Sequence, residues 1–276
     1  MNMQKDDHIL PVLRIISIVV LPFLVLAFLI LYLAPQTSGE RFAWEIQPAM
    51  MAAFMGAGYL TGAYFFLNVI FIKQWHRIRV ILPGIACFTL FMLLSTIFHW
   101  SRFDIHHAPF QAWLALYIIV PPLISYVWFR NDQADPRTLE HGDVVVPENI
   151  RILVKWISAA LLLVSLIGFA FPQLLIQTWP WELTPLTARV TCGWIVLVGG
   201  GSVFLATEQR WSAWRMAMDV IVIWEVLILI AGFPHLQDLK SGWFNWLFMI
   251  ILLQWIALIV FYINMELHRR RNVHAA

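Results

Sequence analysis

One carboxylate falls in the middle of a long apolar stretch. Glu225 lies near the centre of residues 215–233, in the run Val-Ile-Trp-Glu-Val-Leu. An ionisable group at membrane depth is costly, so it indicates a proton or cation relay by default. The alternative is a protonated structural carboxyl that bonds a polar side chain on a neighbouring helix, with Gln254 or Asn68 as the candidate partners. The sequence leaves both interpretations open.

A second group combines imidazoles with a carboxylate. His99, Asp104, His106 and His107 fall within nine residues between two apolar stretches. Imidazole and carboxylate together are ligands for zinc or non-haem iron, so these four residues are the candidate metal ligands. Their spacing matches no helical ligand motif, and histidines at a membrane border are commonly amphipathic border residues. The metal, and any other cofactor, is not identified by the sequence.

The third candidate is a repeated acidic element. Trp44-Glu45-Ile46-Gln47-Pro48 returns 137 positions later as Trp181-Glu182-Leu183-Thr184-Pro185. The prolines are placed to open helices, the carboxylates lie beside the positive helix ends, and the tryptophans suit headgroup anchors. As the alternative, Glu45 and Glu182 form a symmetric acidic pair that holds a cation or a proton.

The flanks of this element recur in the same register, which indicates a tandem duplication. Arg14 matches Arg151, Gly62 matches Gly199, and the pair Pro35-Gln36 matches Pro172-Gln173. Near the end of each copy the register slips by four residues. Small residues recur on the second helix of each copy, so we expect these two helices to meet near a symmetry axis.

The composition is that of an integral membrane protein. Hydrophobic residues make up 61% of the chain and charged residues 12%, against about a quarter charged in soluble domains. Apolar stretches of this length can cross a bilayer as helices of about 20 residues, and lipid leaves helices as the reasonable conformation. Eight such stretches are present: 10–33, 48–72, 78–99, 111–129, 151–175, 186–207, 215–233 and 243–264.

These observations predict an all-α integral membrane protein with eight transmembrane helices. Four helices per copy return the chain to its starting side, so the two tandem four-helix repeats should be parallel and related by a pseudo-twofold axis along the membrane normal. One set of loops holds 14 of the Lys and Arg residues and the other set holds 4. This excess places both termini in the cytoplasm. Basic residues spread over membrane borders argue against a nucleic-acid partner.

The predicted organisation has four segments. Residues 1–130 form the first membrane repeat, and 131–147 form a polar cytoplasmic linker. Residues 148–267 form the second repeat, and 268–276 form a basic cytoplasmic tail that contains three consecutive arginines. The apolar stretch near the N-terminus is longer than a signal-peptide core, so it is expected to be retained. The predicted location is a cell membrane, and the lack of targeting signals favours the bacterial cytoplasmic membrane.

Three functional hypotheses fit this sequence. The favoured one is a non-enzymatic accessory or scaffold subunit of a membrane assembly, in contact with the bilayer, other subunits, lipids or pigments. The second is a proton-linked transporter of a small solute that uses Glu225, with a broken helix at Pro121-Pro122 near the midplane. The third is a membrane enzyme with the His/Asp site described above. Phosphate-binding loops, His-Glu-x-x-His and Gly-x-Ser-x-Gly are absent from the sequence.

Overall fold

The computed structural model describes residues 6–275. It is 78% helical, and the described residues contain isolated β-bridges but no strand. The long helices are α1 (Pro11–Phe28), α3 (Ala49–Phe71), α4 (Leu82–Phe98), α5 (Ala108–Asp132), α6 (Glu148–Ala170), α8 (Pro185–Thr207), α9 (Trp211–Gly232) and α10 (Trp243–Ala275). The short helices are η1 (Leu29–Leu33), η2 (Pro35–Thr37), α2 (Ser38–Arg41), η3 (Trp75–Arg77), η4 (Trp100–Arg102), α7 (Pro172–Thr178) and η5 (Leu236–Asp238).

Six helical segments are long and apolar enough to cross a membrane, so the chain is an all-α membrane protein. They are Pro11–Leu33, Ala49–Phe71, Ala108–Asp132, Glu148–Ala170, Pro185–Thr207 and Asn245–Val273. The other two long helices differ from these. The apolar helix α4 is shorter, with 17 residues, and α9 carries Arg215, Asp219 and Glu225. The expected number of eight crossings is therefore supported for six helices.

Prolines end two helices and leave a third intact. The stretch expected at 151–175 breaks at Phe171, because Pro172 lacks the N–H that would continue α6, and Pro35 follows η1 in the same way. By contrast, α5 runs continuously through Pro121 and Pro122. The helix break that we expected there was wrong.

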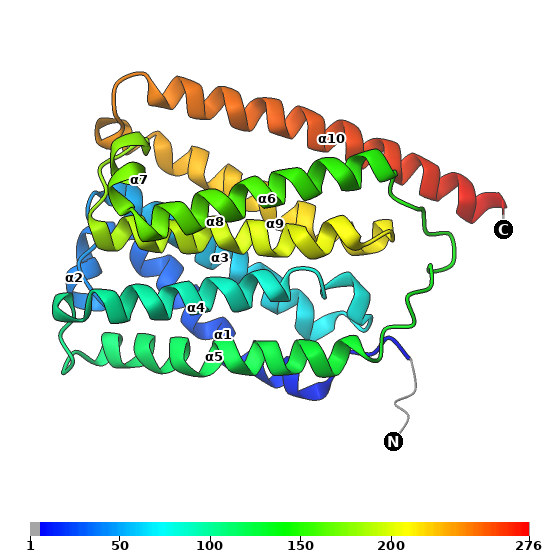
Figure 1. Cartoon of the computed structure of the whole chain (residues 1–276), viewed down its shortest axis with the longest axis horizontal. Helices are drawn as coiled ribbons and strands as arrows, with labels where there is room; N and C mark the ends of the chain where they lie inside the picture. Colours follow the sequence, from blue (N-terminus) through cyan, green and yellow to red (C-terminus); the bar gives the residue numbers. More distant parts are fainter. Residues whose placement is uncertain (1–5, 276) are drawn as a thin grey trace.

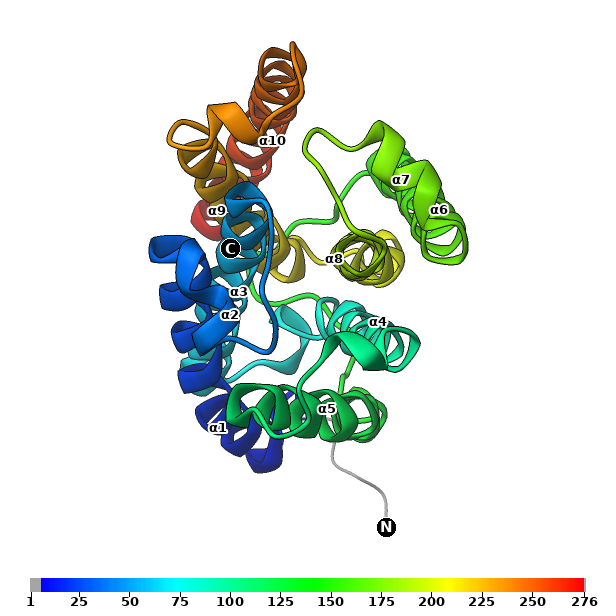
Figure 2. The same cartoon turned by 90° about the vertical axis from the view of Figure 1, so that its left-hand side faces the viewer.

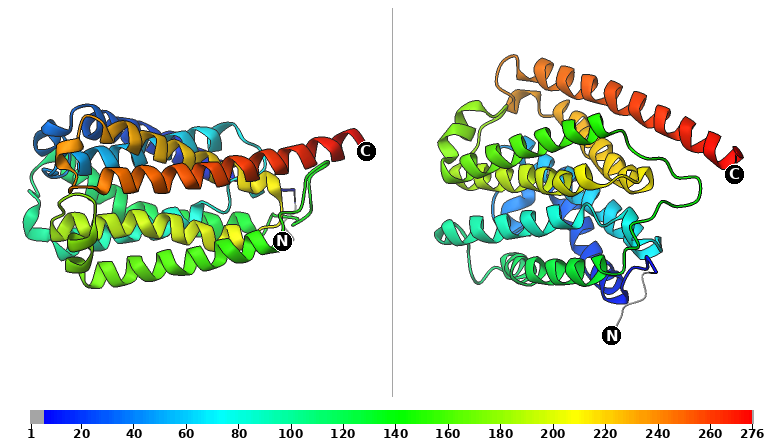
Figure 3. Two further views of the ribbon diagram at one scale, coloured as in Figure 1. Left: turned by 90° about the horizontal axis from the view of Figure 1, so that it is seen from above. Right: turned by 45° about the vertical axis from the view of Figure 1, so that its right-hand side comes forward.

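The long helices form two rows when the molecule is seen from one end (Figure 2). One row contains α10, α9, α3 and α1 in that order, and the other contains α6, α8, α4 and α5; each helix contacts its neighbour in the row. Helix α1 also contacts α5, which joins the rows along one edge. The further views in Figure 3 show α10 lying along the outside of the bundle.

The bundle has two ends of different character (Figure 1). We call one the terminus end: it holds the start of α1, the α3–α4 loop, the segment 133–147, the α8–α9 loop and the end of α10. The other, called the opposite end, holds α2, α7 and the α4–α5 and α9–α10 loops. Charged side chains are concentrated at the terminus end, and tryptophan and phenylalanine cluster at the opposite end.

Glycine permits the closest contact between the rows and within them. A Cβ atom on Gly84 of α4 would lie 2.3 Å from the Leu197 carbonyl oxygen of α8, which is backbone and cannot move aside. A Cβ on Gly58 of α3 would lie 2.3 Å from the indole ring of Trp194 on α8. The second helix of each expected repeat therefore contacts the other through Gly58 and Trp194.

Candidate functional site

A cavity of about 160 Å³ lies between the two rows of helices. Residues of α1, α3, α4, α5, α8 and α9 line it, so both rows contribute. Five aromatic side chains surround one part of the cavity, namely Tyr59, Phe88, Tyr117, Trp194 and Trp224. Aliphatic and small residues such as Val80, Leu205 and Ala217 line the part nearer the terminus end. An apolar cavity of about this size stays dry and accepts apolar molecules.

Few polar groups reach this cavity. The Tyr59 and Tyr117 hydroxyls lie 3.2 Å apart and bond each other, and the hydroxyls of Thr61 and Thr89 bond carbonyls of their own helices. The indole N–H of Trp194 is buried and has no hydrogen-bond partner. The cavity therefore favours a hydrocarbon guest, and Trp194 offers one N–H to an oxygen acceptor.

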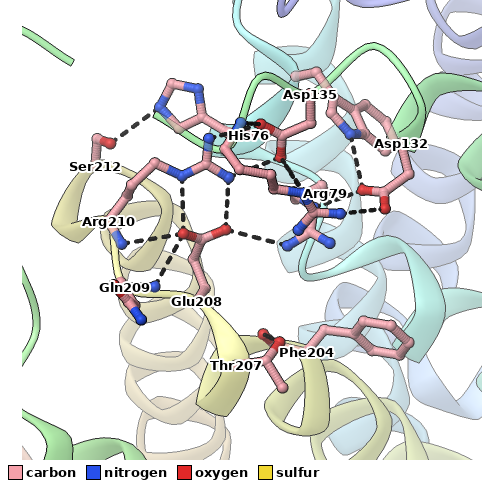
Figure 4. Close-up of polar contacts among 12 residues, drawn as sticks. His76, Arg79, Asp132, Asp135, Phe204, Thr207, Glu208, Gln209, Arg210 and Ser212 are labelled. Atoms are coloured by element: carbon pink, nitrogen blue, oxygen red, sulfur yellow. Dashed lines mark hydrogen bonds and ion pairs between the residues drawn. The ribbon is translucent and has the colours of Figure 1, made fainter. Parts of the chain in front are cut away.

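A second concentrated feature is a buried ion network at the terminus end (Figure 4). The Arg210 guanidinium donates two bonds to Asp135, at 2.8 and 2.7 Å, and two more to Glu208, at 2.8 and 2.7 Å. Arg79 bonds Glu208 at 3.1 Å and Asp132 at 2.7 Å. Hydrogen bonds to ionised partners offset the desolvation of these charges.

The electrostatics of this network favour the charged forms. Burial raises the pKa of Asp135 and of Glu208, but hydrogen bonds and charge from Arg210 outweigh it and hold both pKa values below their usual range. The pKa of Arg210 is raised, since burial opposes its charge less than the two carboxylates favour it. The network ties α4, the α8–α9 loop and the segment after α5 into one unit.

His76 lies at the centre of a neighbouring set of contacts and is almost completely buried, at 1% exposed. Its Nδ1 lies 2.5 Å from Asp7 Oδ2, and its Nε2 lies 2.8 Å from Glu140 Oε1 and 3.0 Å from the Ser212 hydroxyl. Burial lowers the pKa of His76, but hydrogen bonds from Asp7 and Glu140 raise it above the ordinary value overall. The hydrogen bond with His76, aided by Arg77, lowers the pKa of Glu140 to about 2.

Asp7, His76 and Ser212 share the connectivity of an Asp-His-Ser nucleophile, but the surrounding contacts favour a structural role. The Ser212 hydroxyl donates to Asp143 at 2.6 Å, so its hydrogen is directed away from the imidazole. His76 lies between two carboxylates and holds its proton, so it is a poor general base. This set is best described as an ion-pair network that joins the chain segments.

Contacts at the terminus end recur at a spacing of 136 residues. The Trp75 N–H bonds the Asp7 carbonyl at 2.7 Å, and the Trp211 N–H bonds the Val144 carbonyl at 3.0 Å. The next residue in each case bonds an aspartate: His76 N to Asp7 Oδ1 at 3.0 Å, and Ser212 N to Asp143 Oδ1 at 3.1 Å. This spacing is one residue shorter than that of the repeated Trp-Glu-x-x-Pro element.

A three-residue contact set recurs with the same spacing. In each set one carboxylate oxygen accepts a bond from a tryptophan indole and from the Nε of an arginine four residues later. The distances are 3.3 and 2.7 Å in the first set and 2.9 and 3.2 Å in the second. The sets are Trp75, Arg79 and Asp132, and Trp211, Arg215 and Glu266.

Glu225 lies on the side of α9 that contacts α10, away from the cavity. Gln254 of α10 donates to Glu225 Oε1, and the Trp255 indole donates to Glu225 Oε2 at 2.8 Å. Gln254 is thus the partner found among our two candidates, whereas Asn68 bonds the Tyr64 carbonyl of its own helix. Trp224, the preceding residue, lines the cavity instead.

The repeated Trp-Glu-x-x-Pro elements lie at the opposite end with exposed carboxylates. Glu45 accepts a bond from Gln47 at 3.1 Å, and Glu182 lies 3.8 Å from the Lys240 ammonium. The two tryptophans are buried in aromatic clusters, so the expectation of headgroup anchors was wrong. The predicted Thr184 cap is confirmed as a capping box with Thr187 at the start of α8.

The four candidate metal ligands have separate surroundings. His99 Nε2 lies 2.7 Å from the Arg189 guanidinium, and His107 Nε2 lies 3.0 Å from the Phe42 carbonyl oxygen. Asp104 accepts a bond from the backbone N–H of His106 at 2.9 Å, and both side chains are exposed. Among the described residues, no three His, Cys, Asp or Glu side chains converge to hold a metal ion. A metal site at this end stays a prediction.

The ion network and the cavity were missed by reasoning from the sequence. We treated Arg79 and Arg210 as markers of membrane orientation and left Glu208 and Asp135 unassigned. A usable signal was present, because carboxylates interrupt the basic loops at the helix ends that form the network. The cavity has no such signal, since its lining residues are ordinary apolar residues of six different helices.

Comparisons with protein-family models, with curated proteins and with solved structures find no match for this chain. The fold and its apolar helices define an all-α, multi-pass membrane protein. Its function must therefore be argued from the cavity, the ion network and the surfaces described above.

Proposed function

We propose that the chain consists of two parallel four-helix repeats with eight transmembrane helices, related by a pseudo-twofold axis along the membrane normal. The order of the helix rows supports this arrangement: α10, α9, α3, α1 in one direction corresponds to α5, α4, α8, α6 in the other. The contacts that recur 136 residues apart support it as well. In this arrangement α4 and α9 cross the membrane together with the six more apolar segments.

In the proposed orientation the terminus end is cytoplasmic. The basic loops, the linker and the basic tail lie there, in agreement with the rule that Lys and Arg concentrate on the inner side. A bacterial cytoplasmic membrane is the proposed location. The chain lies within the bilayer over the length of its helices, and the two charged networks lie at the inner border, where water and headgroups solvate their exposed parts.

We propose that the protein is a non-enzymatic accessory or scaffold subunit that holds one hydrocarbon chain of a lipid or pigment between its two halves. The observation that carries this function is the apolar cavity enclosed by both rows of helices. Burying a chain between aromatic and aliphatic side chains gains dispersion contacts that a void lacks.

The shape of the cavity favours a chain over a large ring system. Along α8 the lining extends from Trp194 to Leu205, about 16 Å at the helical rise of 1.5 Å per residue. A volume of about 160 Å³ spread over this length gives a narrow space. A single acyl or prenyl chain fits such a space, and its oxygen-bearing end can accept the unpaired N–H of Trp194.

Photocrosslinking tests this assignment. A fatty acid with a photoreactive group in its chain is added to the purified protein and irradiated, and the labelled peptides are identified by mass spectrometry. Labels in Trp194–Leu205 and in residues 217–224 support the proposal. Labels confined to the lipid-facing side of α6 and α10 would count against it, since those helices are exposed to any hydrophobic probe.

A proton-linked transporter is the second candidate, and Glu225 is the observation that favours it. The carboxylate is held between α9 and α10 by Gln254 and Trp255, which is a defined site for a proton. In proteoliposomes, Glu225→Gln should abolish solute-dependent proton flux if this function is correct. Flux that is unchanged in the variant, or absent in the wild type, would remove the support for transport.

A further inference from the structure

A basic cluster without an acidic partner lies at the opposite end of the bundle. It consists of His99, Arg102 and Arg189. The Arg189 Nη1 lies 2.7 Å from His99 Nε2, and the Arg102 backbone N–H bonds the His99 carbonyl at 2.8 Å. Among the ion pairs of residues 6–275, none involves Arg102 or Arg189.

The contact between Arg189 and His99 fixes the imidazole as neutral. Arginine stays protonated in proteins, so its N–H donates and His99 Nε2 accepts. Burial and the positive charges of Arg189 and Arg102 lower the pKa of His99, in agreement with this assignment. The imidazole then carries its hydrogen on Nδ1, which leaves a third donor beside the two guanidinium groups.

The surroundings hold the Arg189 guanidinium in a fixed orientation. Its Nε donates to the Phe169 carbonyl at 3.1 Å, and its central carbon lies 5.5 Å from the Phe98 ring and 5.8 Å from the Phe169 ring. Phe98 and Trp100 are largely exposed, as aromatic side chains at a membrane border are. The cluster therefore lies where the apolar helices α4, α6 and α8 end.

We propose that His99, Arg102 and Arg189 bind a phosphate group at this membrane border. Two guanidinium groups and an imidazole N–H supply donors in the geometry that phosphate oxygens accept, and a phosphate supplies the negative charge that the cluster lacks. The phosphate belongs to the headgroup of a phospholipid or is a free phosphate ion. This site is separate from the central cavity and does not depend on the function proposed for it.

Native mass spectrometry of the full chain in a neutral detergent tests this site. The probes are phosphatidylglycerol, the neutral lipid diacylglycerol, and inorganic phosphate as a competitor. Wild type should retain phosphatidylglycerol, and Arg189→Gln should weaken retention about ten- to a hundredfold. Release by inorganic phosphate identifies a free-ion site, and resistance to it identifies a headgroup site.

Two further variants keep the test decisive. Arg102 is exposed, so Arg102→Gln should fold normally and still weaken phosphatidylglycerol retention. Lys240→Gln removes the same unit of charge at the same end, but Lys240 already pairs with Glu182, so retention should not change. Equal retention by wild type, Arg189→Gln and Arg102→Gln, or equal retention of diacylglycerol and phosphatidylglycerol, would overturn the proposal.

Discussion

The imidazole Nε2 of His76 lies 3.0 Å from the hydroxyl of Ser212, 136 residues further along the chain. Each of the two residues also receives an aspartate on its backbone N–H, from Asp7 and from Asp143. Residues at matching positions of the two proposed repeats therefore contact each other directly. With the bonds between Arg79 and Glu208, this contact makes the terminus end the firmest connection between the halves.

The pH dependence of stability should reveal the proton on His76. Because Asp7 and Glu140 raise its pKa above the ordinary 6.5, the folded state binds this proton more tightly than the unfolded state does. The stabilisation is complete below pH 6.5 and is lost as pH rises through the raised pKa. The wild-type melting temperature should fall between pH 6 and 9 by at least about 2 °C more than that of His76→Gln.

The control for this experiment is the acid side. Glu140 has its pKa lowered to about 2, so its contribution is lost only as pH falls toward that value, well outside the tested window. Arg77 and Arg210 stay charged throughout, and Asp143 faces Ser212, which does not titrate in this range. Equal slopes for wild type and His76→Gln between pH 6 and 9 would show that His76 carries no linked proton.

Removing Arg210 should be the most damaging single change in the ion network. Arg210→Gln leaves Asp135 and Glu208 buried without their main partner, which should cost about 3–5 kcal/mol of unfolding free energy. The exposed Arg130 is the matched control, and Arg130→Gln should cost about 1 kcal/mol or less. Denaturant titration monitored by helical circular dichroism measures both. Similar midpoints for the two variants would contradict this account of the network.

The two recurring tryptophan–arginine–carboxylate sets should differ in strength. Arg79 is 3% exposed and Arg215 is 39% exposed, so solvent screens the second set far more. Asp132→Asn should cost about 3 kcal/mol, and Glu266→Gln about 1 kcal/mol or less, since the amide oxygen still accepts from Trp211. Thermal unfolding in matched detergent measures the difference. A larger loss for Glu266→Gln would contradict the assignment.

Two glycines of the membrane helices should respond in opposite ways to alanine. Gly84→Ala forces a Cβ against the Leu197 carbonyl and should cost about 1–3 kcal/mol. Gly62→Ala meets only Leu24 Cδ1 at 3.6 Å, which is ordinary contact, and should be neutral or stabilise by up to about 1 kcal/mol. The melting temperatures of the two variants test the closeness of α4 to α8. Equal effects would mean that these helices are further apart.

The helices were predictable because each apolar stretch has one strong physical requirement. Burial of the backbone in lipid demands helices, and proline explains the breaks at Pro35 and Pro172. The same proline rule failed at Pro121 and Pro122, where packing keeps α5 continuous. The burial of Trp44 and Trp181 was also not predictable, since an interfacial tryptophan can face headgroups or a neighbouring helix with the same local sequence.

The sites were less predictable because they depend on contacts between distant segments. Glu225 was found from its unusual depth, and one of its two candidate partners, Gln254, is correct. His76 gave no local signal, since its three side-chain partners come from residues 7, 140 and 212. The His/Asp group looked compact in sequence, but its side chains face different neighbours.

The most direct test of the central cavity is native mass spectrometry of a matched pair of variants. Val220 lines the cavity, and Val203 is exposed on the surface of α8. Val220→Phe fills the space, whereas Val203→Phe adds the same ring outside it. We expect wild type and Val203→Phe to retain a chain-bearing molecule after purification in mild detergent, and Val220→Phe to lose it. Equal retention by all three proteins, or no bound molecule in wild type, would contradict the proposed function.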